Sequence, residues 1–376
     1  MNLDFSADQQ AMRVEFRKAL AAASPRSALE HRKGEAAVFD RALWQRLADL
    51  GWLGTAVPDR HGGSGLDAVT LCVLAEEVGR AMAAVPFTAS ACGFAHALGV
   101  AATPETNDLC AALWPRLVDG SLVGVLLTSE GWREAPRVTT VSESEATLSG
   151  TALHVLDGTV ATHALACVGS GARACLVLID LATVARQGLA DRPLDLLHPT
   201  ATLAFDETPV RVLATGARAL QRWDQLFDSY ALFTAFEQLG SAEAALQMAR
   251  EYSLDRYAFG RPIGSFQAIK HMLADMLVAM DLARSNCYFG AASLSMGPEA
   301  LRESSAVARI SATDAFRLCA RGSIQVHGAI GVTWESNCHL YYRRAQALAS
   351  SPGSLRFWKE RLIELLKRRR LAEGFA

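Results

Sequence analysis

Strand-like segments are confined to the middle of this 376-residue chain, and this segregation limits the possible folds more than any other feature of the sequence. Short apolar runs broken by Gly, Ser, Asp and Pro follow one another there: SLVGVLLTSE, ATLSGTALHVLDG, HALACVGS, ACLVLIDL and ATLAFDETPVRVL. Several of them alternate apolar and polar residues, which is typical of strands. Because no helical segment separates them, they favour an antiparallel barrel or sandwich over a parallel βαβ sheet.

The regions on both sides of these strands show the apolar spacing of helices. Near the N-terminus, Ser6 and Gln9 form a capping-box pattern that predicts the start of a helix. Helical patterns return at 66–82 and 89–118, after a loop-like stretch rich in Gly and Pro at 51–65. The helical segments after the strands are 218–254, 264–292, 298–327, 335–350 and 354–371.

These patterns predict an α+β fold in three parts. They are an N-terminal helical domain at 1–120, a middle antiparallel β-domain at 121–215 and a C-terminal domain of the four-helix-bundle type at 216–376. The chain is long enough to bury a large core. Its formal net charge of −2 provides no global positive field for nucleic acid or an anionic membrane. Any polyanion must therefore bind through a local basic cluster.

The cysteine pattern and the N-terminus indicate a cytoplasmic protein. The eight cysteines are scattered, without a C-x-x-C pair or a Cys/His group at zinc spacing, so the sequence predicts free thiols and no metal site. The N-terminus lacks the basic and apolar regions of a secretory signal. The longest uncharged stretch, 81–104, contains Pro86 and many small polar residues and is a poor membrane span.

One acidic residue, Glu237, lies in an otherwise apolar helical pattern. On a helix it shares a face with Tyr230, Thr234 and Ser241, and the other faces are apolar as well. Burial would raise the pKa of its carboxyl group and make Glu237 a candidate general base. The alternative is a partly exposed acid paired with a Lys or Arg side chain. Both interpretations are open at this point.

A basic turn, RYAFGRPIG, follows the same helical segment. Arg256 and Arg261 flank Gly260. Arginine makes bidentate contacts with phosphate oxygens, and glycine lets backbone N–H groups approach an anion closely. Phe259 could stack on a purine. The turn is thus a candidate site for an anionic cofactor or substrate. A compatible alternative is a plain helix–helix turn in which Gly260 is a C-cap and Pro262 begins the next helix.

A glycine-rich break, GSIQVHGAIGVTWE, separates two later helical segments and contains Gln325, His327 and Gly328. It is not a Walker loop, since no Gly-Lys-Ser/Thr follows. It is not a dinucleotide-binding fingerprint either, because no strand precedes it. His327 has a second interpretation, as a hydrogen-bonded core histidine. Alone, this break does not define a function.

Together these motifs resemble the acyl-CoA dehydrogenase superfamily over nearly the whole chain. The stretch LGWLGTAVPDRHGGSGLD is similar to the first helical domain of the family, and RYAFGRPIGSFQAIKHMLADM and IQVHGAIGVTWESNCHLYYRRA are similar to two C-terminal motifs. The order of helical, β and helical domains agrees. The wording of the motifs is most similar to bacterial enzymes that act on CoA thioesters of steroid side chains.

The resemblance implies an FAD-dependent enzyme that introduces an α,β-double bond into an acyl-CoA thioester. In the family, a glutamate removes the α-proton while the β-hydrogen leaves as hydride to the flavin N5, which implies Glu237 as the catalytic base. FAD is usually bound across a subunit interface. The matching cofactor-binding positions are Arg256, Phe259, Gly260, Gln267, Gln325, Gly328 and Thr128. The implied partners are the acyl-CoA substrate, an electron-transfer flavoprotein or similar acceptor, and the other subunits of a homo- or heterotetramer.

The chain departs from the family pattern at two places. Many members carry the catalytic glutamate late in the chain, where this sequence has Pro352; other members, the steroid type included, carry it at the position of Glu237. In the β-domain, Thr128-Ser-Glu130-Gly131 and His154-Val-Leu-Asp157-Gly158 stand where the family usually has flavin- and thioester-holding motifs. The residues that reach the diphosphate are present, whereas those that face the flavin differ.

These observations leave three hypotheses. The first is FAD-dependent desaturation of a bulky or steroid-type acyl-CoA, by this chain or by a heteromer that contains it. The second is a structural subunit without chemistry of its own, which completes the FAD site of a catalytic partner. The third is an acyl-CoA oxidase or a flavin enzyme of another acyl thioester pathway.

Overall fold

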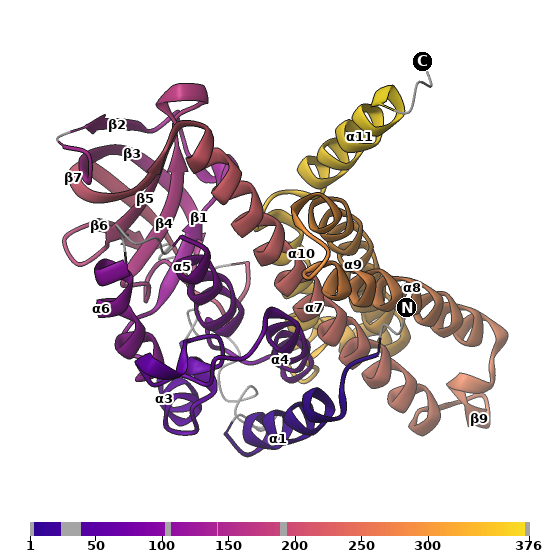
Figure 1. Cartoon of the computed structure of the whole chain (residues 1–376). Coiled ribbons are helices and arrows are strands. Elements are labelled where there is room, and N and C mark those ends of the chain that lie inside the picture. The colour runs from indigo at the N-terminus through magenta and orange to yellow at the C-terminus, as the bar shows by residue number, and fades with distance from the viewer. Residues whose placement is uncertain (1–3, 24–38, 102–106, 141, 189–193, 373–376) are drawn as a thin grey trace. The chain divides into compact units, whose positions relative to one another are not determined.

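The computed structural model describes residues 4–23, 39–101, 107–140, 142–188 and 194–372 (Figure 1). Contacts divide the chain into two compact units, each built from separate stretches of sequence. The first unit comprises Met1–Lys33, Cys72–Ala83 and Ala231–Ala376, and the second comprises Gly34–Leu71 and Ala84–Tyr230. The N-terminal third thus contributes to both units. The division into three domains by sequence range remains a prediction.

The second unit is organised around one sheet. Its strands are β1 Gly124–Leu127, β2 Arg137–Thr140, β3 Glu145–Leu156, β4 His163–Val168, β5 Cys175–Asp180, β6 Ala185–Gly188 and β7 Thr200–Thr215. Their order is β1-β4-β5-β7-β3-β2, and β6 pairs with β7. The β1–β4 pair is parallel and the other described pairs are antiparallel. The sheet is therefore mixed and not purely antiparallel as expected. The difference arises because the chain passes through β2 and β3 between β1 and β4 and so has a crossover long enough for parallel pairing.

Most of the strands lie within the apolar runs that predicted them, but β2 and β6 were missed. Both are four residues long, and β2 is mostly exposed. β2 lies at one end of the strand order, and β6 pairs with β7 alone. Short polar strands are usual at sheet edges, where a long apolar strand would invite pairing with another chain. Such strands leave little apolar periodicity in a sequence.

The two faces of the sheet belong to different apolar clusters. In β1, Val125 and Leu127 pack in one cluster, while Leu126 packs in the other. This follows from the period of two of a strand. The second cluster also contains residues of the π-helix Phe87–Phe94, of α5 Ala95–Ala101 and of α6 Asn107–Val118. Gly124 permits close contact here, since a Cβ at this position would lie 2.1 Å from the ring of Phe94.

The remaining helices are α1 Ala7–Ala23, α3 Arg41–Asp49, α4 Ala68–Ala81, α7 Gly216–Asp255, α8 Gln267–Ser293, α9 Pro298–His327, α10 Cys338–Ser350 and α11 Leu355–Ala372. The expected capping box is present at the start of α1: the Ser6 N–H donates to Gln9 Oε1 at 2.9 Å, and the Gln9 N–H donates to Ser6 Oγ at 3.2 Å. These findings confirm the α+β fold. Among the helices in the described part of the chain, none combines the length and apolar character that a membrane crossing requires.

In the first unit, two glycines let α4 and α7 approach at backbone distance. A Cβ on Gly79 would lie 1.8 Å from the carbonyl oxygen of Glu237, and a Cβ on Gly240 would lie 1.8 Å from the carbonyl oxygen of Glu76. Neither position can hold a larger residue without a shift of a helix. The Ser241 hydroxyl also donates to the Gly79 carbonyl at 3.0 Å. The segment of α7 that carries Glu237 is therefore fixed against α4.

Candidate functional site

Glu237 is 4% exposed, as its apolar helical surroundings predict. Its carboxylate does not lie in a purely apolar environment, however. Arg344 on α10, which is 1% exposed, donates from Nη2 to Glu237 Oε1. Burial disfavours an ionised carboxylate, while a contacting guanidinium favours it. The structure thus combines the burial expected of a base with the arginine pairing of the alternative interpretation, and the catalytic role of Glu237 stays a prediction.

A second buried arginine, Arg309 on α9, lies beside this pair. Its Nη1 donates to the side-chain oxygen of Gln238 at 2.6 Å and to the hydroxyl of Thr313. Its Nη2 donates to the carbonyl oxygen of Leu348 and, at 3.0 Å, to that of Ser351. Glu237 and Gln238 are consecutive on α7, so two arginines from two different helices hold neighbouring residues of the same turn. The network connects α7, α9 and the end of α10.

The stretch around Pro352, where many family members carry their base, has a structural role in this chain. The carbonyl oxygen of Ser351 accepts from Arg309, and that of Pro352 accepts from the indole Nε1 of the buried Trp358 at 2.8 Å. Proline has no side-chain proton acceptor. This stretch therefore offers no acid in place of Glu237.

The basic turn is a β-hairpin rather than a plain turn between helices. α7 ends at Asp255, and the strands β8 Tyr257–Ala258 and β9 Arg261–Pro262 pair before α8 begins. Phe259 and Gly260 have φ angles of 51° and 78°, so both central residues of the two-residue loop are left-handed. The alternative in which Gly260 caps a helix and Pro262 starts the next one is wrong.

The hairpin presents an exposed basic and aromatic tip. Phe259 is 96% exposed, and Arg256 is exposed as well. The Arg261 guanidinium lies over the ring of Phe266 at 4.2 Å from its centroid. A Cβ on Gly260 would meet no atom within 4 Å, so the backbone here is open to a ligand. Cations, an exposed ring and open backbone are the features that a phosphate-bearing cofactor needs.

The glycine-rich break lies at the same end of the first unit as the hairpin. α9 ends at His327, and the exposed Gly328 follows with a φ of 64°. The His327 ring stacks on Tyr252 at 4.1 Å between centroids, four residues before Arg256 on α7. His327 Nδ1 lies 2.8 Å from the carbonyl oxygen of Ser323. His327 is thus a packed, hydrogen-bonded residue that joins the two motifs.

Two further predicted cofactor residues lie in different places. Gln267 is the exposed first residue of α8, directly after the hairpin. Thr128 is half-buried at the end of β1 in the second unit, where its carbonyl accepts from the Gly131 N–H at 3.0 Å. The first unit thus brings the hairpin, Gln267, Gln325 and Gly328 to one end of its bundle. The roles of these residues in binding stay predictions.

Glu237 is remote from that end of the bundle. Arg256 directly follows the last residue of α7 and lies 19 positions after Glu237, which at 1.5 Å per residue corresponds to about 28 Å along the helix. Within one chain, the acid and the hairpin therefore cannot contact the same reacting group. The two features lie in one continuous stretch of sequence, and their separation in space agrees with the family resemblance, which implies an FAD site across a subunit interface.

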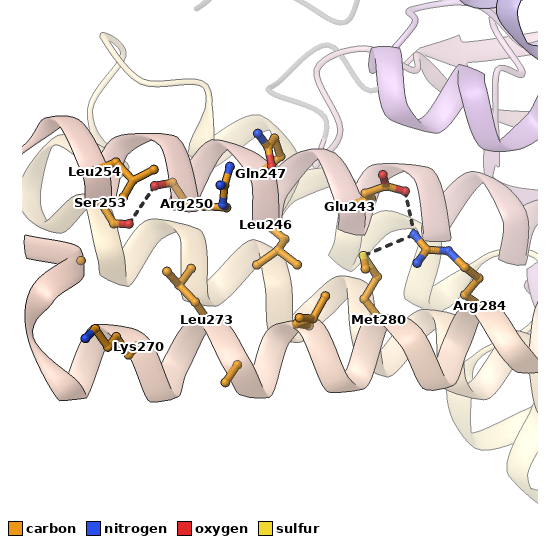
Figure 2. A pocket seen from close by; sticks show the side chains of 13 residues that line it. Glu243, Leu246, Gln247, Arg250, Ser253, Leu254, Lys270, Leu273, Met280 and Arg284 are labelled. Carbon is orange, nitrogen blue, oxygen red and sulfur yellow. Dashed lines mark hydrogen bonds and ion pairs between the residues drawn. The ribbon is translucent and has the colours of Figure 1, made fainter.

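A cavity of about 600 Å³ lies between α7 and α8 and was not predicted (Figure 2). The ion pair of Glu243 with Arg284, at 2.9 Å, lies at one end, and Lys270 lies at the other. Leu246 and Leu273 point into the space between them (Figure 2). Glu237 does not line this cavity. The cavity adjoins the hairpin end of the bundle and is separate from the candidate base.

Ion pairs surround the α4–α7 contact. Within these ion pairs, the pKa values of Glu76 and Glu243 are shifted in opposite directions. Burial raises the pKa of Glu76, although Arg13 and Arg80 lower it in part. Burial alone would raise the pKa of Glu243 too, but the hydrogen bond and charge of Arg80, together with Arg284, hold it below its ordinary value.

In the second unit, Asp157 forms a buried pair with His198. Asp157 belongs to the stretch that stands in place of a flavin- or thioester-holding motif. His198 Nδ1 lies 2.9 Å from Asp157 Oδ1, and both side chains are almost fully buried. Asp157 and His154 have φ angles of 59° and 50°. The Arg186 guanidinium donates to the carbonyl of Thr159 at 3.0 Å and fixes the same turn. Sequence reasoning singled out Asp157 but missed His198, which lies 41 residues away and has no local signal.

The helical units, the mixed sheet, the buried acid on α7 and the basic hairpin define the class of flavoprotein oxidoreductases that act on acyl-CoA. Residues 6–120 match the family described as "Acyl-CoA dehydrogenase, N-terminal domain", and residues 220–355 match "Acyl-CoA dehydrogenase, C-terminal domain". The chain belongs to the acyl-CoA dehydrogenase family, whose members are FAD-dependent oxidoreductases.

Relatives and solved structures agree with this assignment. Acyl-CoA dehydrogenase FadE27 of Mycobacterium tuberculosis is 31% identical over 335 residues, which cover 85% of this chain and 87% of the relative. Acyl-CoA dehydrogenase IpdE2 of the same organism is 28% identical over 319 residues, covering 83% and 82%. The ChsE4–ChsE5 complex of Mycobacterium tuberculosis has a TM-score of 0.86 at 26% identity and 99% coverage of both chains. The family resemblance inferred from the motifs is confirmed.

The residues of the first unit fit part of an FAD group. Arg256 supplies a cation, Phe259 an exposed ring, and Gly260 and Gly328 offer backbone where no side chain would meet a neighbouring atom. These features suit a diphosphate and an adenine.

Proposed function

We propose that this chain takes part in the α,β-desaturation of an acyl-CoA thioester with Glu237 as the catalytic base. The observation that carries the proposal is a buried carboxylate held in one orientation on α7 by Arg344. The side chain at the alternative base position is Pro352, which cannot accept a proton. Family membership supports the reaction type, and the buried acid supplies the group that the reaction requires.

In this proposal Glu237 accepts the α-proton of the thioester and becomes a neutral carboxylic acid. The electron pair of the broken α-C–H bond forms the double bond as the β-hydrogen leaves as hydride. Bound FAD supplies the hydride acceptor. A buried base suits this step because water that would compete for the proton is kept away. Arg344 remains next to Glu237 and holds the carboxylate through its Oε1 atom.

We further propose that the hairpin serves FAD at the active site of another chain in an assembly. Arg256 and Phe259 are separated from Glu237 by about 28 Å of helix, so the two features act on different active sites. The similarity to the two-protein ChsE4–ChsE5 complex and to a structure described as a steroid ACAD supports a heteromer and a bulky, steroid-type acyl group. An electron-transfer flavoprotein or similar acceptor would reoxidise the flavin.

The substitution Glu237→Gln tests the base directly. It removes the proton acceptor while keeping the size of the side chain, so turnover with an artificial electron acceptor and any partner subunit present should fall by roughly 100-fold or more. The matched control is Glu251→Gln, which makes the same change at an exposed position of α7. Full turnover by Glu237→Gln, with normal flavin content, would remove Glu237 as the base.

A structural subunit that completes the FAD site of a catalytic partner is the second candidate. It is favoured by the second unit, where the Asp157 carboxylate is occupied by His198 instead of being available to a ligand. Flavin stoichiometry separates the two candidates. Less than one FAD per chain in the complete assembly, together with unchanged turnover in Glu237→Gln, would support the structural subunit.

A further inference from the structure

Arg344 on α10 and Glu237 on α7 form a pair whose two members are 107 positions apart in sequence, and both side chains are almost fully buried. A buried arginine without an anion would be strongly unfavourable, and so would a buried carboxylate without a cation. The pair therefore has a definite electrostatic consequence. The guanidinium favours the charged form of Glu237, whereas burial favours the neutral form.

We propose that Arg344 is a positioning residue of the reaction, which keeps the Glu237 carboxylate ionised and aims it. The inference rests on the proposed role of Glu237 as the base. A base has to be ionised before it can take a proton, and a buried acid would otherwise ionise only at high pH. Arg344 thus sets the pH range in which the base is ready, at the cost of some of its basicity.

The surrounding network holds both ends of the pair. Arg309 donates to Gln238, the residue next to Glu237, and to the carbonyl oxygen of Leu348, one turn beyond Arg344 on α10. One side chain of α9 therefore fixes α7 beside the acid and α10 beside the arginine. This arrangement limits the distance over which the Arg344 side chain can move away.

Several other charged groups in the described part of the first unit have partners of their own. α4 contacts Glu237 through the backbone at Gly79, while the carboxylate of Glu76 accepts from Arg13 and Arg80 and that of Glu77 accepts from Arg17. On α8, Arg284 pairs with Glu243. On α9, Arg309 binds the amide of Gln238. Arg344, by contrast, donates directly to the acid.

The test uses the full chain with FAD and its partner subunit and measures kcat/KM against pH for wild type, Arg344→Lys and Arg344→Gln. Loss of the cation should move the acid limb of the profile up by roughly 1–3 pH units in Arg344→Gln. Arg344→Lys, which keeps the charge but loses the planar fork, should move it less. Lower activity at every pH with an unmoved limb would overturn the inference, because a merely structural residue would give that result.

Infrared spectroscopy supplies a readout that does not depend on turnover. The carbonyl band of the protonated Glu237 acid, assigned by its loss in Glu237→Gln, should appear at higher pH in Arg344→Gln than in wild type. If Arg344→Gln does not fold, the pH at which the band appears is compared between Arg344→Lys and wild type. The double variant Glu237→Gln/Arg344→Gln, which removes both charges, should unfold at a higher temperature than Arg344→Gln alone.

The outcomes separate this inference from the proposed function. Loss of turnover in Glu237→Gln with an unshifted infrared band in the Arg344 variants leaves Glu237 as the base and overturns the role of Arg344. A shifted band together with full turnover in Glu237→Gln shows a structural ion pair and overturns both.

Discussion

Two glycines determine how closely the helix that carries Glu237 can approach α4. Each faces a backbone carbonyl oxygen of the other helix, at 1.8 Å from where a Cβ would lie. A carbonyl cannot rotate away as a side chain can, so any larger residue must separate the helices. The orientation of Glu237 toward Arg344 thus depends on the absence of a side chain at Gly79 and Gly240.

Gly240→Ala is therefore expected to destabilise the protein, although alanine is the better helix former. Forcing one methyl group into this contact should lower the free energy of unfolding by about 1–3 kcal/mol. The control is Gly99→Ala, because a Cβ there would meet nothing within 4 Å and should be neutral or slightly stabilising. Urea unfolding of both variants provides the measurement. Equal stability of Gly240→Ala and wild type would show that the helices can move apart freely.

Helices of the C-terminal half were predictable as elements because their apolar periodicity is long. The segments expected at 218–254 and 298–327 correspond to α7 and α9. The conformation of the hairpin was not predictable. Gly260 signals a left-handed residue, but nothing in the sequence indicates that Phe259 adopts a positive φ, which is uncommon for a bulky residue.

Contacts between helices or strands were the features that the sequence predicted least well. The acid at Glu237 and its apolar surroundings followed from the pattern of α7, which left open whether the carboxylate is buried or partly exposed. Its partner Arg344 did not, because one sequence does not show which of its many arginines reaches a given acid. The same holds for His198 and Asp157. The candidate site was therefore predictable as a set of residue types on particular helices, but its electrostatic environment required the structure.

At the scale of elements, the ion pairs of Glu243 join α4, α7 and α8 and predict a pH dependence of stability. The pKa of Glu243 is lowered in the folded protein, so its contribution is present above the pKa of the unfolded chain and is lost as pH falls through the folded value. Glu243→Gln should cost about 1 kcal/mol or less at pH 7, because the pair is partly exposed.

Urea unfolding of Glu243→Gln and wild type at pH 7 and pH 4 measures this effect. The difference between the two proteins should shrink at the lower pH. Glu76, whose raised pKa acts in the opposite direction, is present in both proteins and largely cancels in the comparison. The same difference at both pH values would show that the ion pairs contribute nothing to stability.

At the scale of the whole molecule, one chain carries two features with proposed functions, and they lie too far apart to act on the same group. The hairpin with Arg256 and Phe259 lies about 28 Å along α7 from Glu237. With the roles proposed for Glu237 and the hairpin, a second chain completes each site. The similarity to the two-protein ChsE4–ChsE5 complex supports the proposal that a base from one chain and diphosphate ligands from another act together.

Arg256→Gln in the complete assembly tests whether the hairpin binds FAD while Glu237 serves turnover. The lost guanidinium should weaken FAD binding by roughly 10-fold or more, since charge-assisted bonds to phosphate are among the stronger polar contacts. The unfolding temperature of the apo chain should not change, because Arg256 is exposed. Flavin content after dialysis and apo-protein melting measure the two effects. Glu237→Gln should show the converse, with full flavin content and little turnover.

If Arg256→Gln retains flavin as wild type does, the hairpin does not hold the diphosphate. A matched control is Arg368→Gln, an exposed arginine on α11 that should alter neither quantity.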